Sequence, residues 1–152
     1  MRAIVQRASS ASITIDHTAG GSIGQGLVVL LGIHQDDTPQ DAEWLLRKLL
    51  NLRIFDDEAG MPNLSVQDIA GELLVVSQFT LHANTKKGNR PSYNTAAKPE
   101  VAIPLYEQFL KGLSNHFDGT VHTGKFGAYM EVSLVNDGPF TIILDSRNPA
   151  LE

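Results

Sequence analysis

Two long apolar segments predict the central strands of a sheet. Residues 27–33 are apolar apart from one glycine, and residues 72–81 begin with an equally apolar run that ends in Ser77-Gln78-Phe79-Thr80-Leu81. A short apolar run without alternation is typical of a strand that is buried on both faces. We therefore expect both strands in the interior of the sheet, and the second to present polar side chains at its end.

Alternating apolar and polar positions predict further strands near both ends of the chain. Residues 2–15 alternate loosely, which indicates one strand or two short ones, followed by a turn at Gly20-Gly21. Residues 120–145 also alternate and are interrupted at Asp137-Gly138-Pro139, so at least two strands are expected there. Judged from the residues alone, Gly138-Pro139 is a turn that the neighbouring Asn136 and Asp137 favour.

Two segments have the periodicity of helices. Thr38 and Pro39 are suited to the N-cap and the first helical position. The residues that follow place an apolar stripe with a charged flank on one face, formed by Trp44, Leu45, Lys48, Leu49 and Leu52. Residues 99–113 also look helical, although Pro104 must start, kink or interrupt that helix.

The order of the elements predicts the fold class. A short strand is expected at Arg53–Phe55, closed by a polar turn at residues 56–60. The chain is thus rich in strands with two helices inserted, which predicts an α+β fold with a β-rich, barrel-like mixed sheet and two main helices. With 152 residues and no linker or internal repeat, residues 1–152 are expected to form a single domain.

The composition excludes several kinds of chemistry. The chain has no cysteine, so disulfide frameworks, thiolate metal sites and cysteine nucleophiles are excluded. The five histidines show no i, i+4 pair, and the acidic clusters at residues 36–37 and 56–58 fall in predicted turns. We therefore expect no metal and no cofactor. The apolar stretch at the N-terminus is too short and too polar for a signal peptide.

Positive charge is concentrated in one loop of an acidic chain. The net charge is −5, yet the segment from Leu73 to Pro99 contains no Asp or Glu and four cations, Lys86, Lys87, Arg90 and Lys98. Polar residues and Tyr93 surround them, which is typical of a loop that contacts phosphates and can stack on a base or ribose. A solvated, flexible basic loop is the alternative.

The hydroxyl groups of Ser77 and Thr80 are candidates for nucleophilic chemistry. No Gly-x-Ser-x-Gly elbow is present, and no histidine lies near them in the sequence except His82. The members of a catalytic triad are distant in sequence, so spacing alone does not reveal one. The alternative is that both hydroxyls only satisfy backbone groups.

Five stretches, in order along the whole chain, resemble the D-aminoacyl-tRNA deacylase family. The most specific are Ser77-Gln78-Phe79-Thr80-Leu81 and Asn136-Asp137-Gly138-Pro139-Phe140-Thr141, which look like its two signature motifs. The opening Met1–Arg7 with the glycine-rich hairpin after it, Lys87–Ser92 and Thr123–Ala128 are also similar to that family.

The resemblance implies a function and a set of site residues. It implies a cytoplasmic homodimer that hydrolyses the ester between a D-amino acid and the 3′-terminal ribose of tRNA, and also glycine wrongly attached to tRNA for alanine. Gly138 and Pro139 would be joined by a cis bond and would enter the other subunit's pocket as a chirality gate. The catalytic pocket would contain Ser77, Gln78, Phe79 and Thr80, the supporting residues would be Arg7, Asn136 and Thr141, and tRNA would contact Lys86, Lys87 and Arg90.

Two mechanisms follow for Thr80 within this resemblance. Thr80 is either a nucleophile, or the 2′-OH of the RNA assists while the protein positions the ester. Because the sequence offers Thr80 no clear base, we favour the second. Backbone N–H groups near Phe79 could then bind the developing oxyanion. A rigid Gly-Pro backbone could hold the α-amino group and clash with an L side chain. Glycine has no side chain to clash, so a glycyl ester would also be accepted.

Phe140 and Tyr129 depart from the family pattern, which has a smaller β-branched residue at the first position and a smaller or acidic residue at the second. We expect neither to touch the motif residues. Two functions are alternatives to the deacylase. One is a non-catalytic RNA-binding module that uses residues 83–98, and the other is a generic small-molecule esterase.

Overall fold

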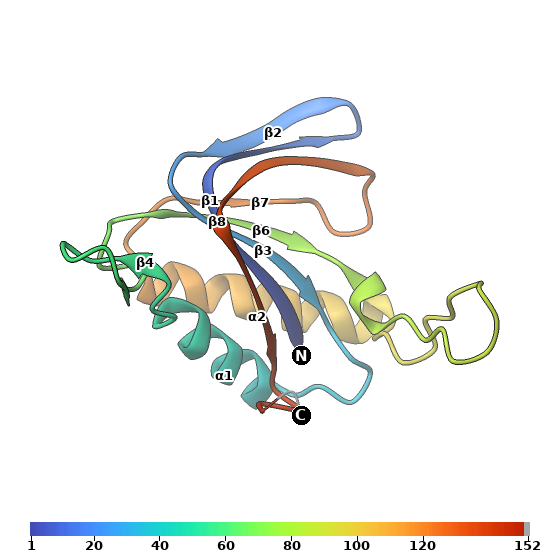
Figure 1. Cartoon of the computed structure of the whole chain (residues 1–152). Helices are drawn as coiled ribbons and strands as arrows, with labels where there is room; N and C mark the ends of the chain where they lie inside the picture. The colour runs from blue at the N-terminus through green and yellow to red at the C-terminus, as the bar shows by residue number, and fades with distance from the viewer. Residues whose placement is uncertain (151–152) are drawn as a thin grey trace.

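The computed structural model describes residues 1–150 as a curved mixed sheet covered on one face by two helices (Figure 1). Five strands follow one another across the sheet in the order β2 (Thr18–Ile23), β1 (Arg2–Ile15), β3 (Gly26–Gly32), β6 (Glu72–Ser77) and β7 (Val121–Thr123). Strands β3, β6 and β7 are parallel neighbours, whereas β1 is antiparallel to its partners. The predicted α+β fold with a barrel-like mixed sheet and two helices is confirmed.

Strand β1 organises the sheet because it pairs with three other strands. Its first half pairs with β3, its second half pairs with β2, and β8 (Met130–Asp145) runs along it from Ile15 back to Arg2. Of the two predicted alternatives, one strand or two short ones, the structure has the single strand. Since the partner on one edge changes halfway along β1, the sheet curls toward a barrel (Figure 1).

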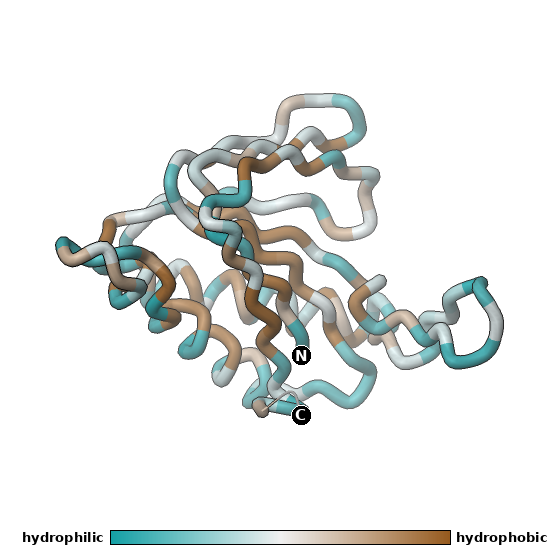
Figure 2. The backbone as a smooth tube through the Cα atoms, viewed as in Figure 1, coloured by the Kyte–Doolittle hydropathy of each residue, from teal (hydrophilic) through white to brown (hydrophobic). Residues whose placement is uncertain are grey.

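The curled sheet has two apolar interiors. The larger lies between the sheet and the helices, where Val5, Leu27, Leu73 and Phe109 are almost inaccessible to solvent. The smaller is enclosed by the curl itself and contains Ala11, Ile13, Ile23, Val28 and Leu74 among others. Figure 2 shows this apolar colour along the strands and the inner sides of the helices. Burial of this kind is the main favourable contribution to folding.

The two helices begin as the sequence predicts and pack against each other under the sheet. Helix α1 (Pro39–Leu50) has Thr38 as its N-cap, and Leu45 and Leu49 are fully buried. Helix α2 (Pro99–His116) is three residues longer than predicted and includes Pro104 within it. No helix in residues 1–150 is long and apolar enough to cross a membrane.

The predicted turn at Gly20-Gly21 is wrong, because both glycines lie inside β2. The hairpin instead turns at Asp16 and His17, which both have positive φ angles of 48° and 65°. Two residues with positive φ form the type of turn whose twist suits a hairpin. A side chain at Gly21 would collide with His122 of β7, so the glycine allows β2 and β7 to approach and nearly close the sheet.

Three further element boundaries differ from the prediction. Strand β6 ends at Ser77, and Phe79–His82 form a 3₁₀ helix, η1, in place of the strand end that was expected up to Leu81. The strand expected at Arg53–Phe55 is instead β4 (Phe55–Asp56), which pairs with the unpredicted β5 (Pro62–Leu64). The expected break at residues 137–139 is a bulge within the continuous β8.

Candidate active site

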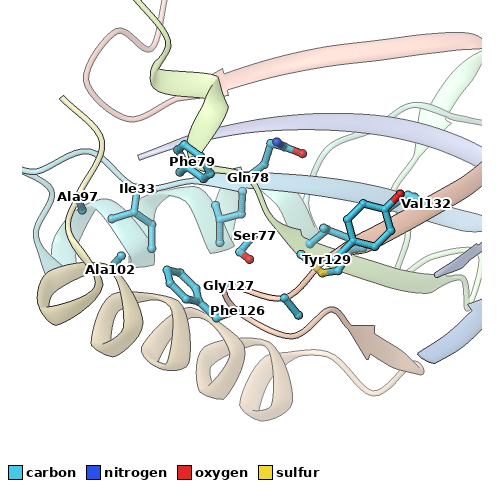
Figure 3. Close-up of a pocket in the computed structure, with 14 residues that line it drawn as sticks. Ile33, Ser77, Gln78, Phe79, Ala97, Ala102, Phe126, Gly127, Tyr129 and Val132 are labelled. Carbon is cyan, nitrogen blue, oxygen red and sulfur yellow. The ribbon is translucent and has the colours of Figure 1, made fainter. Parts of the chain in front are cut away.

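A pocket of about 310 Å³ opens where the parallel strands β3 and β6 end. Leu31 and Ser77 are paired at this edge, so the side chains that follow both strands meet there. Ligand sites in sheets of this kind commonly lie outside the carboxyl ends of parallel strands. Figure 3 shows Ser77, Gln78 and Phe79 around this space, together with Ile33, Phe126 and Tyr129.

The walls of the pocket are apolar and carry no charge. Ser77 at the end of β6 and Gln78 after it supply polar side chains, while the start of β8 contributes Met130 and Val132. No histidine, carboxylate, lysine or arginine is among the lining residues. Within residues 1–150 no cluster of three potential metal ligands occurs either. The pocket can therefore orient a substrate, but it offers no histidine, carboxylate or lysine for acid–base catalysis.

Thr80 stands just outside the pocket and its hydroxyl is bonded to an amide. Nε2 of Gln78 donates to Oγ1 of Thr80. A hydroxyl nucleophile needs a neighbouring group that takes its proton. An amide is not such a base. The geometry therefore favours the positioning interpretation of Thr80 over the nucleophilic one.

His82, the one histidine near Thr80 in the sequence, is buried on another side of η1. Its ring lies edge-on to His34, with ring centroids 5.4 Å apart, and Nε2 has no hydrogen-bond partner among the described residues. Burial lowers the pKa of His82 below its ordinary value, and the nearby charges of Arg2 and His34 lower it further. A neutral, enclosed imidazole is not placed to activate Thr80.

The basic loop begins at the pocket and projects away from the body of the molecule (Figure 1). The backbones of Asn84 and Ser92 pair across its base, and Tyr93 packs edge-on against Phe79 with ring centroids 5.0 Å apart. The Tyr93 ring therefore packs against Phe79 of the pocket, although the sequence predicted a ring that stacks on a base or ribose. Beyond this base the cations Lys86, Lys87 and Arg90 are exposed, and none of them forms an ion pair within residues 1–150.

Gly138 and Pro139 lie in a bulge of β8, not in the pocket of their own chain. Thr141 pairs with Gln6 and Asn136 with Ala8, so residues 137–140 lie opposite the single residue Arg7. Both Gly138 and Pro139 are exposed, and the bond between them is cis. Gly138 has a φ of 123°, and a side chain there would collide with the Phe140 ring. Glycine is therefore required at this position.

Side chains from β1 and β8 hold the bulge in place. Arg7 is 5% exposed; its Nε lies 3.2 Å from the carbonyl oxygen of Asp137, and its Nη1 donates to the carbonyl oxygen of Ile54 at 2.8 Å. Nδ2 of Asn136 donates to the carbonyl oxygens of Arg7 and Phe140, each at 2.9 Å. Thr141 is more peripheral and accepts a hydrogen bond from Gln6. The predicted supporting residues thus gather at the bulge.

For Phe140, the expectation that it touches no motif residue is wrong. The Arg7 guanidinium lies 4.3 Å from the centre of the Phe140 ring, and Tyr129 lines the same pocket as Ser77 and Gln78. The pocket also has lining residues for which the sequence predicts no role, among them Leu31, Ile33, Phe126, Met130 and Val132. The segment Thr123–Ala128, noted only as a resemblance, contains the signal that could have located this wall.

Solved structures share this architecture. A structure described as c-Myc DNA Unwinding Element Binding Protein superimposes with a TM-score of 0.90 at 45% identity, covering 95% of this chain and 98% of its own. Another, described as a probable eukaryotic D-amino acid tRNA deacylase, has a TM-score of 0.81 at 17% identity and covers 94% and 97% of the two chains. At that lower identity, the second likeness establishes the fold alone.

Comparison of sequences is more specific. Residues 4–145 match the family model of D-Tyr-tRNA(Tyr) deacylase, and the chain belongs to this family. It is 55% identical to the D-aminoacyl-tRNA deacylase of Bacteroides thetaiotaomicron over 97% of its length and 99% of the relative's. It is 57% identical to the protein of the same name from Chromobacterium violaceum over 98% and 99%. The resemblance of the motifs, and with it the assignment to a family of deacylating enzymes, is confirmed.

Proposed function

We propose that the chain hydrolyses the ester bond of D-aminoacyl-tRNA and releases the free amino acid and tRNA. Membership of the deacylase family supports the reaction. The observation that supports the site is the uncharged pocket at the ends of β3 and β6, with a basic loop leading away from it whose Lys86, Lys87 and Arg90 form no ion pair within residues 1–150. The loop suits the phosphates of an RNA 3′ end, and the pocket suits the esterified nucleoside.

In this proposal the protein positions the ester, and the 2′-OH of the RNA assists hydrolysis of the ester bond. Water attacks the ester carbonyl, the ester bond to the 3′ oxygen breaks, and a proton from the water is transferred to that oxygen. The neighbouring 2′-OH stabilises the reacting groups by hydrogen bonding. The amides that begin η1 at Phe79 and Thr80 bind the developing oxyanion, because the first N–H groups of a helix have no acceptor within it. The hydrogen bond from Gln78 to Thr80 keeps this segment rigid.

Selection of D over L amino acids is assigned to the Gly138–Pro139 bulge. The pair is exposed and lies outside the pocket of its own chain, so in this proposal it serves the pocket of a second subunit in a homodimer. Backbone carbonyls presented to the α-amino group would accept one handedness whatever the side chain. A glycyl ester has no side chain to reject, so glycine mischarged on tRNA for alanine would also be hydrolysed. Since charged tRNA is the substrate, we place this activity in the cytoplasm.

Hydrolysis of matched D and L substrates tests the function. The protein is incubated with D-tyrosyl-tRNA and L-tyrosyl-tRNA, and release of free tyrosine is followed with time. We expect rapid release from the D form and none above background from the L form. Equal release from both, or binding of tRNA without turnover, would contradict the proposal; the second result would favour a non-catalytic RNA-binding module.

The same assay with a 2′-deoxy 3′-terminal nucleotide tests the RNA-assisted mechanism. We expect hydrolysis of the D ester to be largely lost while the RNA still binds. A simple D-tyrosine ethyl ester is the second control, and rapid cleavage of it would indicate a generic esterase instead.

A further inference from the structure

Tyr129 is a large aromatic residue that is exposed at the wall of the pocket. Its exposed fraction is 58%, and that of Phe79 in the same pocket is 56%. Exposed apolar surface that borders a cavity marks a binding site more often than isolated apolar residues do. Figure 3 shows the two rings at different parts of the rim, with Ser77 and Gln78 between them.

The backbone of Tyr129 is fixed by the turn between β1 and β2. The Asp16 N–H donates to the Tyr129 carbonyl oxygen at 2.9 Å, and the Tyr129 N–H donates to Oδ1 of Asp16 at 3.3 Å. The His17 ring lies against the Tyr129 ring with centroids 5.4 Å apart. These contacts hold the ring at the rim and reduce the entropy lost when a ligand packs on it.

The surroundings of the ring indicate the chemistry of the ligand. Beside Tyr129 the wall consists of Ala128, Met130 and Val132, and no lining residue is charged. The Phe79 ring is already engaged by Tyr93, whereas the neighbour of Tyr129 is the exposed side chain of His17. A flat, uncharged group suits such a surface. Unpaired bases of single-stranded RNA are commonly bound by stacking on aromatic side chains.

We propose that Tyr129 stacks on the terminal nucleobase of the RNA 3′ end and so positions the ester over Ser77 and Gln78. This inference rests on the proposed function for the identity of the RNA. The terminal nucleotide is shared by all tRNAs, whereas the amino-acid side chain differs among them. A fixed ring that contacted the side chain would favour some amino acids over others, which a chirality proofreader must avoid. The base is therefore the better partner.

The test compares RNA that has the terminal base with RNA that lacks it. Affinity for an uncharged tRNA acceptor-stem hairpin is measured by fluorescence titration, with an intact or an abasic 3′-terminal nucleotide. Tyr129→Leu should weaken binding of the intact RNA by roughly tenfold and leave the affinity for the abasic RNA unchanged. Tyr129→Phe retains the ring without the hydroxyl and should bind both RNAs like the unchanged protein.

Kinetics with two esters separate the base from the amino-acid side chain. Tyr129→Leu should raise KM by a similar factor for D-tyrosyl-tRNA and D-alanyl-tRNA, with kcat little changed. A rise in KM limited to the D-tyrosyl ester would show contact with the side chain and overturn the proposal. Equal weakening of intact and abasic RNA would also overturn it. Because the titration needs no turnover, its result stands even if the hydrolysis assay fails.

Discussion

The Ser77–Thr80 segment and the Gly138–Pro139 bulge reach the surface in opposite ways. Ser77–Thr80 begins at the last residue of β6, whose residues Leu73–Val76 are buried, and the Gln78 N–H donates to the Leu31 carbonyl oxygen at 2.7 Å, so backbone pairing fixes it. The bulge interrupts strand pairing, and the buried side chain of Arg7 and the amide of Asn136 hold it instead. One region borders a cavity of its own chain, and the other projects exposed backbone outside that cavity.

This difference separates the two tasks that the proposed reaction requires. A pocket without charged groups can hold an ester but offers no charged side chain to bind its α-amino group. A backbone element fixed by buried side chains can distinguish D from L amino acids, but in this proposal it needs the pocket of a second subunit to hold the ester. We therefore expect substitutions at the two places to change different measurable quantities.

The largest effect is expected for Arg7→Ala. The carbonyl oxygens of Ile54 and Asp137 would lose their donor, and Phe140 would lose the guanidinium beside its ring. Loss of such buried contacts lowers the free energy of unfolding by about 3 kcal/mol. We also expect the D/L ratio of deacylation rates to fall. Urea unfolding and the paired tyrosyl-tRNA assay measure the two effects.

Arg53→Ala is the matched control for this substitution. Arg53 is exposed, and its Nε donates to one backbone carbonyl, that of Asn63, at 2.8 Å. Its loss should change the free energy of unfolding by about 0.5 kcal/mol or less and leave the D/L ratio intact. If Arg7→Ala destabilised the protein yet retained full discrimination, the bulge would not be the chirality gate.

An intermediate effect on the free energy of unfolding is expected at acidic pH. It should arise from His82 in η1 and not from the bulge. Burial lowers the pKa of His82 in the folded chain, with smaller contributions from Arg2 and His34 in the same direction, while a hydrogen bond to the Gly32 backbone and the charge of Asp37 oppose them. The unfolded chain therefore binds this proton at the higher pH. Stability from the neutral imidazole is complete above about pH 6.5 and declines as the pH falls below it.

Urea midpoints between pH 8 and pH 5 measure this dependence. In His82→Gln the decline below about pH 6.5 should become shallower, because the titrating group is gone. His17→Gln is the control, since the His17 side chain is 82% exposed and its loss should leave the slope unchanged. An unchanged slope in His82→Gln would place the acid-sensitive group elsewhere.

The smallest effect is expected for Thr80→Val, which removes the hydroxyl and keeps the shape. If the hydroxyl only accepts the hydrogen bond from Gln78, kcat for D-tyrosyl-tRNA should fall by about tenfold or less. Loss of a true nucleophile costs on the order of a millionfold in kcat. Single-turnover rates distinguish these cases, with Thr95→Val as a nearby threonine control. A fall of several thousandfold with RNA binding retained would restore Thr80 as the nucleophile.

The sequence was most informative where one local pattern determines the structure. The apolar run at residues 27–33, the alternation in residues 2–15 and the Thr38-Pro39 helix start all correspond to observed elements. It failed where long-range packing decides the conformation. Gly20 and Gly21 look like a turn, yet both lie in β2, where Gly21 allows the approach of β7. Phe79 to Leu81 look like strand residues although β7 pairs only with Leu73–Val75 of β6.

The candidate site was predictable in part for the same reason. Ser77, Gln78 and Phe79 follow directly from a buried strand, so their place at the edge of the sheet can be inferred from the sequence. Tyr129 and Val132 join the pocket only because β8 folds back along β1, more than a hundred residues away in the chain. No local pattern carries that information.

The pairing of β1 with β8 also has a consequence for synthesis. Residue 2 pairs with residue 145, so the most extensive strand pairing of the molecule joins segments that leave the ribosome far apart in time. At about 5–20 residues per second, β1 waits roughly 7 to 30 seconds for its partner. Such non-local pairing slows folding and leaves a strand edge exposed meanwhile. One pocket wall and the proline bulge both arrive with β8, so the nascent chain gains its pocket and its selectivity together, late in translation.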